Sequence, residues 1–245
     1  MKNIKIVLMF DGTAYHGFQR QNNAVTIQET LEKSISRITG ENISLTGCSR
    51  TDAGVHAKMY VANFLSDTKI PPDKIPFALN SALPDDIKVL SAVYEDEEFN
   101  ARKHAVEKTY CYTVINRVHN DVFLKRYGWF FPYPLDVEKM QKAAAFFEGE
   151  HDFSAFMSAG GSAKTFVRHM KKLNVTVEDD GVIKIYATAN GFLYNMVRII
   201  AGTLVCVGAG RIKCDDIPDI ILSKERKRAG ITAPPEGLML LDVKY

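Results

Sequence analysis

One apolar stretch, from Gly191 to Gly210, limits most strongly what this chain can fold into. Arg198 is the only charged residue in it. So apolar a segment belongs in a core, and a buried arginine needs a partner, because an unpaired buried charge costs several kcal/mol. A membrane span is a poor alternative, since Asn195, Arg198 and four glycines interrupt the run. We therefore expect a core helix from Phe192 to about Val207, whose arginine is either paired or reaches the surface along its alkyl chain.

The first half of the chain alternates strand and helix patterns. A capping box at Thr26–Glu29 begins a helix with one apolar face, and Gly40 ends it. A second, short helix opens at Pro71-Pro72 and ends near Leu83. Strand patterns cover residues 4–10, 42–45, 58–65 and 87–94. The order strand, helix, strand, strand, helix, strand is that of a ferredoxin-like fold.

The second half repeats this order with longer loops. It starts after the acidic run Glu95–Glu98, where we place the domain boundary. Its elements are a strand over 108–116, a helix capped by Asp136, a hairpin turned at Asp180-Gly181, the apolar helix, and a strand over 238–243. We therefore predict an α+β protein with two ferredoxin-like (β-α-β-β-α-β) halves, residues 1–98 and 99–245, whose antiparallel sheets meet around a central cleft.

Composition excludes several classes of protein. A chain of 245 residues with 46% hydrophobic content is long enough for two domains. Its net charge of +2 means that a nucleic acid would have to bind a local basic patch. None of the four cysteines forms a C-x-x-C pair or has a histidine at ligand spacing, which argues against a zinc site and favours a reducing cytoplasm. The N-terminus runs directly into a strand pattern and is not a signal peptide.

The stretch from Gly47 to Ala57 holds the densest group of chemically active side chains. It joins two strand patterns, and Arg50, Asp52 and His56 crowd together in it beside Gly54. Loops on a rigid scaffold are where binding and catalytic groups tend to lie. On its own, the loop could also be a plain turn in which Asp52 caps an amide and Arg50 is solvated.

Residues 50–57, Arg-Thr-Asp-Ala-Gly-Val-His-Ala, match every fixed position of a known signature, Arg-Thr-Asp-x-Gly-Val-His-Ala. In this the chain resembles the tRNA pseudouridine synthase A family. Ser49 stands where that family usually has glycine. Further motifs of the family are matched at Asp11–Gln19, Phe99–Arg102, Lys108–Tyr112, Asn195–Arg198 and Ala233–Leu238. The resemblance therefore extends over nearly the whole chain.

The resemblance implies roles for particular residues. Asp52 would be the nucleophile that attacks the target uridine, after which the glycosidic bond breaks, the uracil rotates and C5 rejoins the sugar. Two routes stay open, attack at C6 of the base and attack at C1′ of the ribose. Arg198 would pair with Asp52, Tyr110 would stack on the flipped-out base, and Leu238 would contribute to the floor of the site. Without the family, Tyr110 is more simply a core residue and the loop before Leu238 a proline-rich connection.

Basic residues near these motifs are candidates for contacts to RNA. Arg50, Arg102 and Arg168 could position phosphates without reading sequence, although short charged runs are often only solvated. The resemblance further implies that the substrate is the tRNA anticodon stem-loop, at positions 38, 39 and 40. It also implies a cytoplasmic homodimer that needs no metal, no cofactor, no membrane and no other protein partner.

Two other functions compete with this interpretation. A non-catalytic tRNA-binding or chaperone protein could use the same fold, but binding an anionic ligand requires no carboxylate such as Asp52. An aspartyl phosphotransferase is suggested by Phe10–Thr13, which is similar to the Asp-x-Asp-Gly-Thr motif of aspartyl-phosphate phosphatases. The nucleophile of that motif would fall on Met9, which cannot act as one.

Overall fold

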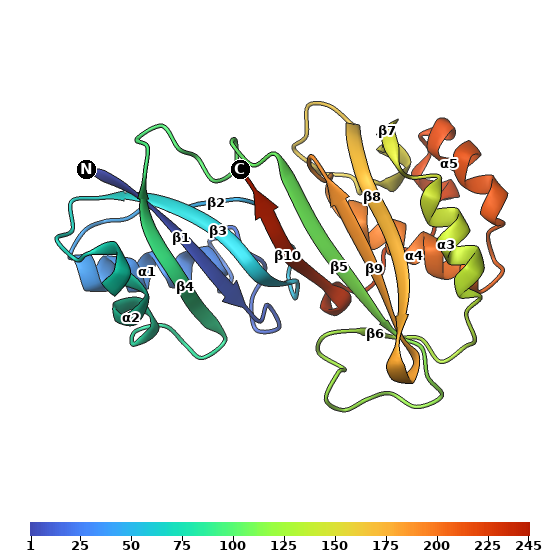
Figure 1. Cartoon of the computed structure of the whole chain (residues 1–245), viewed down its shortest axis with the longest axis horizontal. Helices are drawn as coiled ribbons and strands as arrows, with labels where there is room; N and C mark the ends of the chain where they lie inside the picture. Colours follow the sequence, from blue (N-terminus) through green and yellow to red (C-terminus); the bar gives the residue numbers. More distant parts are fainter. The chain divides into compact units, whose positions relative to one another are not determined.

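The computed structural model describes all 245 residues and divides them into two compact units (Figure 1). The first unit is Met1–Val106 together with Leu240–Tyr245, and the second is Glu107–Met239. Both units are of the mixed α+β kind. Their strands pair almost entirely antiparallel, and they carry five α-helices in all.

The first unit extends past Glu98, where the acidic run suggested a boundary, and takes in the C-terminal residues. The carbonyl of Phe99 accepts a hydrogen bond from Asn63 Nδ2 at 3.1 Å. Its ring lies 5.1 Å from the ring of Tyr245, whose hydroxyl donates to the carbonyl of Ala101 at 2.8 Å. The acidic run is itself bonded to the sheet of the first unit: Glu95 is the last residue of a strand, and the carbonyls of Asp96 and Glu97 accept from Asn3 Nδ2 at 2.8 and 3.4 Å.

The elements of the first unit follow the predicted order, with one exception. They are β1 (Lys2–Phe10), α1 (Ile27–Thr39), β2 (Thr46–Gly47), β3 (His56–Ser66), α2 (Ile75–Asn80), β4 (Ile87–Glu95) and most of β10 (Leu238–Lys244). The sheet order is β4-β1-β3-β10, and β2 pairs with β3. The strand predicted over 42–45 is wrong, because the amide of Leu45 donates to the carboxylate of Glu32 instead of to a strand.

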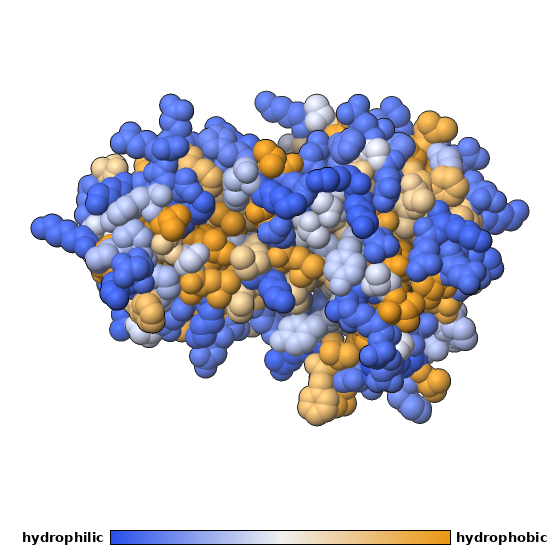
Figure 2. Space-filling view, viewed as in Figure 1, coloured by the Kyte–Doolittle hydropathy of each residue, from blue (hydrophilic) through white to orange (hydrophobic).

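Local signals at the ends of α1 act as predicted. The hydroxyl of Thr26 accepts a hydrogen bond from the amide of Glu29, and Gly40 ends the helix in the left-handed region at φ 75°. The helix buries Ile27, Leu31 and Ile35. The sheet of this unit also has apolar side chains that remain exposed: Met9, Met59, Leu65 and Val93. Apolar patches are visible over this sheet in Figure 2, among mainly hydrophilic side chains.

The second unit is built on a sheet of order β5-β9-β8-β7, to which β6 adds in parallel beside β5. Its elements are β5 (Glu107–Ile115), β6 (Trp129–Phe130), α3 (Val137–Ala145), β7 (Gly149–Asp152), β8 (Val167–Glu178), β9 (Val182–Ala189), α4 (Met196–Gly208) and α5 (Ile217–Ser223). The hairpin between β8 and β9 is confirmed. Its turn residues Asp180 and Gly181 both have positive φ, at 61° and 73°, as such a tight turn requires.

Short 3-10 helices complete both units. They are η1 (Pro72–Lys74), η2 (Ser154–Phe156), η3 (Asp179–Gly181), η4 (Cys214–Asp216), η5 (Arg226–Arg228) and η6 (Pro235–Gly237). Between β5 and β6 the chain makes an irregular connection that exposes Val118, Val122 and Phe123. Arg117 anchors this connection, because its guanidinium pairs with Asp121 at 3.0 Å and with Asp180 of the hairpin turn at 2.8 Å.

The apolar segment forms the core helix α4, as predicted, but the helix begins at Met196 rather than at Phe192. Asn195 lies in the left-handed region at φ 60°, and the amide of Met196 donates to the carbonyl of Leu193 in a turn. Every residue of α4 is buried except Arg198, which is half-buried. None of the helices combines the length and the apolarity needed to cross a lipid bilayer.

Close backbone contact explains the glycine in the middle of α4. A Cβ added at Gly202 would lie 2.0 Å from the carbonyl oxygen of Ile231. The next turn is tied to the same segment, because the amide of Gly230 donates to the hydroxyl of Thr203 at 2.9 Å. The segment before η6 therefore lies directly on α4 with no side chain between them.

We expect Gly202→Ala to destabilise the protein by about 2 kcal/mol, as overpacking of a closed core does. The sign of this change in stability is informative, because replacing glycine by alanine inside a helix normally stabilises a protein by about 0.5–1 kcal/mol. Urea unfolding followed by circular dichroism measures the change. A stabilised variant would contradict the close contact between Gly202 and Ile231.

Candidate functional site

The signature loop is a closed turn between β2 and β3. The amide of Val55 donates to the carbonyl of Asp52 at 3.2 Å, and Gly54 has φ 78°, which glycine adopts without strain. Asp52 is half-buried, whereas Arg50 is exposed. The loop thus holds its carboxylate at the edge of the core.

The segment Asp11–Gln19, which follows β1, is bonded directly to this loop. The amide of Phe18 donates to the carbonyl of Thr51 at 3.1 Å, and the amide of Gly54 donates to the carbonyl of Tyr15 at 3.2 Å. Two motifs that are distant in sequence therefore form one structure. The sequence identified both segments as family motifs but did not predict the contact between them.

Two glycines make this contact possible. A Cβ at Gly12 would lie 2.0 Å from the carbonyl oxygen of Val55. One at Gly17, whose φ is +84°, would lie 2.4 Å from the carbonyl oxygen of Thr51 and 3.1 Å from the carbonyl carbon of Asp52. Any side chain at either position would push the loop, and Asp52 with it, away from the segment Asp11–Gln19.

His56 joins the same contact at the start of β3. It is almost fully buried, and its Nδ1 accepts a hydrogen bond from the amide of Gly12 at 3.1 Å. The same nitrogen lies 3.1 Å from Oδ1 of Asp11, and that oxygen accepts a hydrogen bond from the amide of Thr13. His56 therefore links the end of β1 to the start of β3.

Aromatic packing fixes the first part of the loop. The rings of Phe18 and Tyr60 stack with centroids 4.3 Å apart, and the Tyr60 hydroxyl donates to the carbonyl of Ser49. A Cβ at Gly47 would lie 2.3 Å from the oxygen of Tyr60 and 2.4 Å from the ring of Phe18. Residue 47 must therefore be glycine if both rings are to pack beneath the loop.

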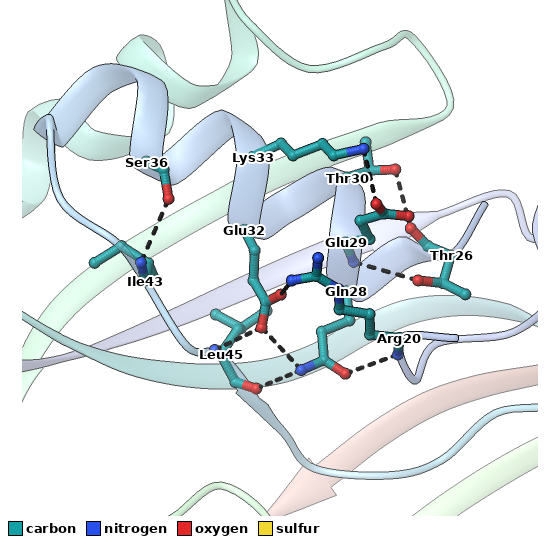
Figure 3. Close-up of polar contacts among 10 residues, drawn as sticks. All are labelled: Arg20, Thr26, Gln28, Glu29, Thr30, Glu32, Lys33, Ser36, Ile43 and Leu45. Atoms are coloured by element: carbon teal, nitrogen blue, oxygen red, sulfur yellow. Dashed lines mark hydrogen bonds and ion pairs between the residues drawn. The ribbon is translucent and has the colours of Figure 1, made fainter. Parts of the chain in front are cut away.

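A polar cluster on α1 ties together the two segments that lead into this structure (Figure 3). The buried carboxylate of Glu32 accepts from the amide of Leu45 at 3.0 Å, from Gln28 Nε2 at 2.9 Å and from Arg20 Nη1 at 3.3 Å. Gln28 also accepts from the amide of Arg20 at 3.0 Å and donates to the carbonyl of Leu45 at 3.0 Å. We did not predict from the sequence the buried role of Glu32 or the contacts that join it to Gln28, Arg20 and Leu45. The available signal was the pair of polar residues at positions i and i+4 beside the apolar face of α1.

In the second unit, Arg198 extends from the first turn of α4 to two neutral acceptors. Its Nε donates to the carbonyl of Ala233 at 2.8 Å, and its Nη1 donates to Oδ1 of Asn195 at 2.8 Å. The backbone amide of Ala233 in turn donates to the carbonyl of Arg198 at 3.1 Å. These bonds fix the plane of the guanidinium.

Tyr110 and Tyr112 lie on β5, and both are buried. The ring of Tyr110 meets the ring of Phe192 edge-on, with centroids 5.1 Å apart. The hydroxyl of Tyr112 donates to the carbonyl of Pro234 at 2.8 Å, and burial raises its pKa. The proline-rich segment that leads to the buried Leu238 therefore contacts both the strand of Tyr110 and the helix of Arg198. Three of the motifs noted in the sequence meet in this unit.

The remaining candidates for RNA contacts differ in exposure. Arg102 is exposed, and its backbone amide donates to Oδ1 of Asn100 at 3.1 Å. Arg168 is half-buried, its Nη1 donates to the carbonyls of Thr165 and Val167 at 3.0 and 2.6 Å, and desolvation lowers its pKa. Arg168 therefore orders its own segment, which a freely solvated arginine would not do.

No metal ligands are assigned. The structure gathers no group of three or more His, Cys, Asp or Glu side chains that could hold a metal ion. None of the four cysteines forms a disulfide bond.

Comparison with known proteins identifies the family. A family model described as tRNA pseudouridine synthase matches residues 6–102 and 143–245. The tRNA pseudouridine synthase A of Thermoanaerobacter sp. (strain X514) is 51% identical over 245 residues, which is 100% of both chains. That of Caldicellulosiruptor bescii is 50% identical with the same coverage. A solved Cbf5-Nop10-Gar1 complex matches 97% of this chain and 48% of that chain, with 12% identity and a TM-score of 0.41. The chain belongs to the tRNA pseudouridine synthase family, which confirms the identification made from the sequence motifs.

We expect Gly17→Ala to lower the rate of pseudouridine formation by on the order of a hundredfold, because the added methyl group displaces the backbone of Asp52. It should also destabilise the protein by about 2–3 kcal/mol through the clash with Thr51 and the left-handed backbone. Single-turnover kinetics and urea unfolding measure the two effects.

Gly40→Ala is the matched control. Gly40 has a similar φ of +75°, but nothing lies within 4 Å of an added Cβ. It should cost about 1–2 kcal/mol and leave the rate unchanged. Equal losses of activity in both variants would show that the contact between Gly17 and the loop does not matter for the reaction.

Proposed function

We propose that this chain isomerises uridine to pseudouridine in tRNA and that Asp52 is its nucleophile. One observation carries the proposal: the signature loop is held rigidly on the first unit, in a chain about half identical over its full length to tRNA pseudouridine synthases A. A carboxylate can form a covalent intermediate with a sugar or base carbon if it is ionised, and an aspartate with an ordinary pKa near 3.9 is ionised at neutral pH.

The reaction that Asp52 would catalyse is balanced within the uridine. The bond from N1 to C1′ breaks, the uracil turns, and a bond from C5 to C1′ forms. A proton leaves C5, and N1 gains one, so no atom is added and nothing is oxidised or reduced. The carboxylate can serve either by attack at C1′ or by attack at C6, and both routes release it unchanged.

Arg198 is proposed to pair with Asp52. The planar guanidinium can engage a carboxylate through two parallel bonds, and it keeps the aspartate ionised. Support comes from the surroundings of Arg198, since Ala233 and Asn195 orient the guanidinium without cancelling its charge. An arginine that only reached outward to water would need neither acceptor.

Tyr110 is proposed to stack on the target base. An enzyme that acts on a base within structured RNA must take it out of the stack, and an aromatic ring can then support it. The edge-on contact with Phe192 would hold the ring of Tyr110 in one orientation. Leu238, also buried, would complete the floor of the site.

The substrate that we propose is the anticodon stem-loop of tRNA, with uridines 38, 39 and 40 as targets. Arg50, Arg102 and Arg168 would position its phosphates. We also propose two ferredoxin-like halves with a cleft between them, supported by the orders β4-β1-β3 and β5-β9-β8. The protein would act as a homodimer in the cytoplasm, where thiols such as its four cysteines stay reduced.

The decisive experiment is to incubate the purified protein with unmodified tRNA and to map pseudouridines at single-nucleotide resolution. We expect conversion at positions 38 to 40 and nowhere else. Tight binding without conversion would instead support the non-catalytic RNA-binding protein.

Replacement of Asp52 tests the nucleophile. We expect Asp52→Asn and Asp52→Ala to abolish pseudouridine formation and to leave tRNA affinity nearly unchanged, because a carboxylate contributes nothing favourable to the binding of phosphates. Tritium release from 5-tritiated uridine in tRNA measures turnover, and filter binding measures affinity. Near-normal turnover of Asp52→Asn would show that Asp52 is not the nucleophile.

The pairing of Arg198 with Asp52 predicts coupled effects. Arg198→Lys keeps the charge but loses the planar guanidinium, which can make two parallel hydrogen bonds. We expect this variant to fold and its turnover to fall about 10- to 100-fold, which corresponds to the loss of one charged hydrogen bond of about 1.5–3 kcal/mol. Arg198→Met should be less stable than the wild type, because it leaves the acceptors at Ala233 and Asn195 without their donor and the proposed partner Asp52 without a counter-charge.

The double variant completes the cycle. If the two side chains pair, Asp52→Asn added to Arg198→Met costs little further activity and restores some stability. Turnover and thermal unfolding of all four proteins give the coupling. Additive losses, or normal activity of Arg198→Met, would mean that Arg198 serves the fold of the second unit alone.

A further inference from the structure

Asn195 occupies the position at which a helix is usually capped, yet it does not cap α4. Asparagine is among the best residues at this position because its side chain accepts from the free amides of the first turn, with the backbone extended. Asn195 instead lies in the left-handed region at φ 60° and ψ 8°, and its side chain makes no capping bond. By contrast, Thr26 on α1 and Asp136 on α3 both make one.

The side chain of Asn195 lies between Arg198 and Ser158. Its Oδ1 accepts from Arg198 Nη1 at 2.8 Å, and its Nδ2 donates to the hydroxyl of Ser158 at 2.9 Å. Because the guanidinium can only donate, the amide oxygen must face Arg198, and Ser158 receives the other end. Ser158 is itself fixed, since its amide donates to the carbonyl of Tyr194 at 3.1 Å.

The guanidinium is thereby held from two directions. Asn195 bonds one terminal nitrogen, and the carbonyl of Ala233 bonds Nε at 2.8 Å. Both acceptors are neutral, so they set the direction of the group without cancelling its charge. The first turn of α4 gives up a capping bond and adopts a left-handed residue to make this arrangement, and such local exceptions concentrate at functional sites.

We infer that Asn195 is a positioning residue, which holds the guanidinium of Arg198 in the orientation that the reaction requires, with Ser158 fixing the amide. The inference rests on the proposed role of Arg198 in catalysis. It assigns to Asn195 no contact with RNA and no part in stabilising α4.

Asn195→Gly is the informative variant. Glycine adopts φ 60° without strain and no capping bond is lost, so the unfolding temperature should stay within about two degrees of the wild type. The guanidinium would lose its hydrogen bond to the Asn195 side chain. We expect kcat to fall by on the order of ten- to a hundredfold, while KM for tRNA changes less than about twofold, because orientation acts on the reacting groups.

Lys224→Gly is the matched control. Lys224 has nearly the same backbone conformation, with φ 57°, but it lies at the end of α5 and its side chain pairs with Asp152. Like Asn195→Gly, this substitution replaces a non-glycine residue whose backbone lies in the left-handed region by glycine. We expect wild-type kcat.

Asn195→Asp separates orientation from charge. The aspartate keeps the acceptor for Arg198 but loses the donor to Ser158 and places a negative charge beside the guanidinium. It would then compete with the proposed partner Asp52, so we expect kcat to fall at least as far as in Asn195→Gly. Ser158→Ala should give a smaller loss, because the amide of Asn195 remains but is less firmly held.

The final test is whether the effect of Asn195→Gly on kcat depends on Arg198. In an Arg198→Lys background, Asn195→Gly should lower kcat by less than about twofold, because the guanidinium that Asn195 orients is already absent. The inference is overturned if Asn195→Gly retains wild-type kcat, if its loss of activity is matched by a fall in unfolding temperature, or if its effect is undiminished beside Arg198→Lys. If Arg198→Lys alone were fully active, the proposed role of Arg198 would fail, which is a separate result.

Discussion

The candidate site of the first unit depends on contact between two stretches of bare backbone. Gly12 and Gly17 lie so close to the carbonyl groups of Val55 and Thr51 that no side chain fits at either position. Backbone hydrogen bonds join the two segments to each other. Further bonds tie them to the core, because the amide of Cys48 donates to the carbonyl of Val61 in β3, and the amides of Ile27 and Gln28 in α1 donate to the segment that follows β1. The loop that carries Asp52 is therefore continuous with the core, although it has no regular secondary structure. A rigid loop is what a nucleophile needs if it must lie within a fraction of an ångström of its target.

Much of the fold could be predicted because its signals are local. The capping threonine of α1, the glycine that ends it and the turn at Asp180-Gly181 all act within a few residues of themselves. The errors have non-local causes. Residues 42–45 look like a strand, but the amide of Leu45 bonds to a carboxylate thirteen residues earlier. The apolar pattern that predicts α4 runs on through residues 192–195, where a left-handed asparagine prevents a helix.

The candidate site shows the same division between local sequence signals and non-local contacts. Motif resemblance named Asp52, Tyr110 and Arg198 as candidates, because the residue types and their spacing are specific. It gave no account of the residues that hold them. The contact of Gly12 with Val55, the bond from Gly12 to His56 and the cluster around Glu32 all join positions far apart in sequence. A sequence pattern records such partners only as unexplained glycines and polar residues.

Two arginines in the second unit have different kinds of partner. Arg117 pairs with the carboxylates of Asp121 and Asp180, so its charge is balanced and it anchors a connection. Arg198 is oriented by an amide and a carbonyl, which accept hydrogen bonds but carry no charge. A structural carboxylate in place of Asn195 would stabilise the guanidinium more and leave it less able to stabilise a second anion. Neutral acceptors would therefore suit an arginine with the proposed role of keeping a carboxylate ionised, and that role would account for an asparagine at this position at the expense of the helix cap.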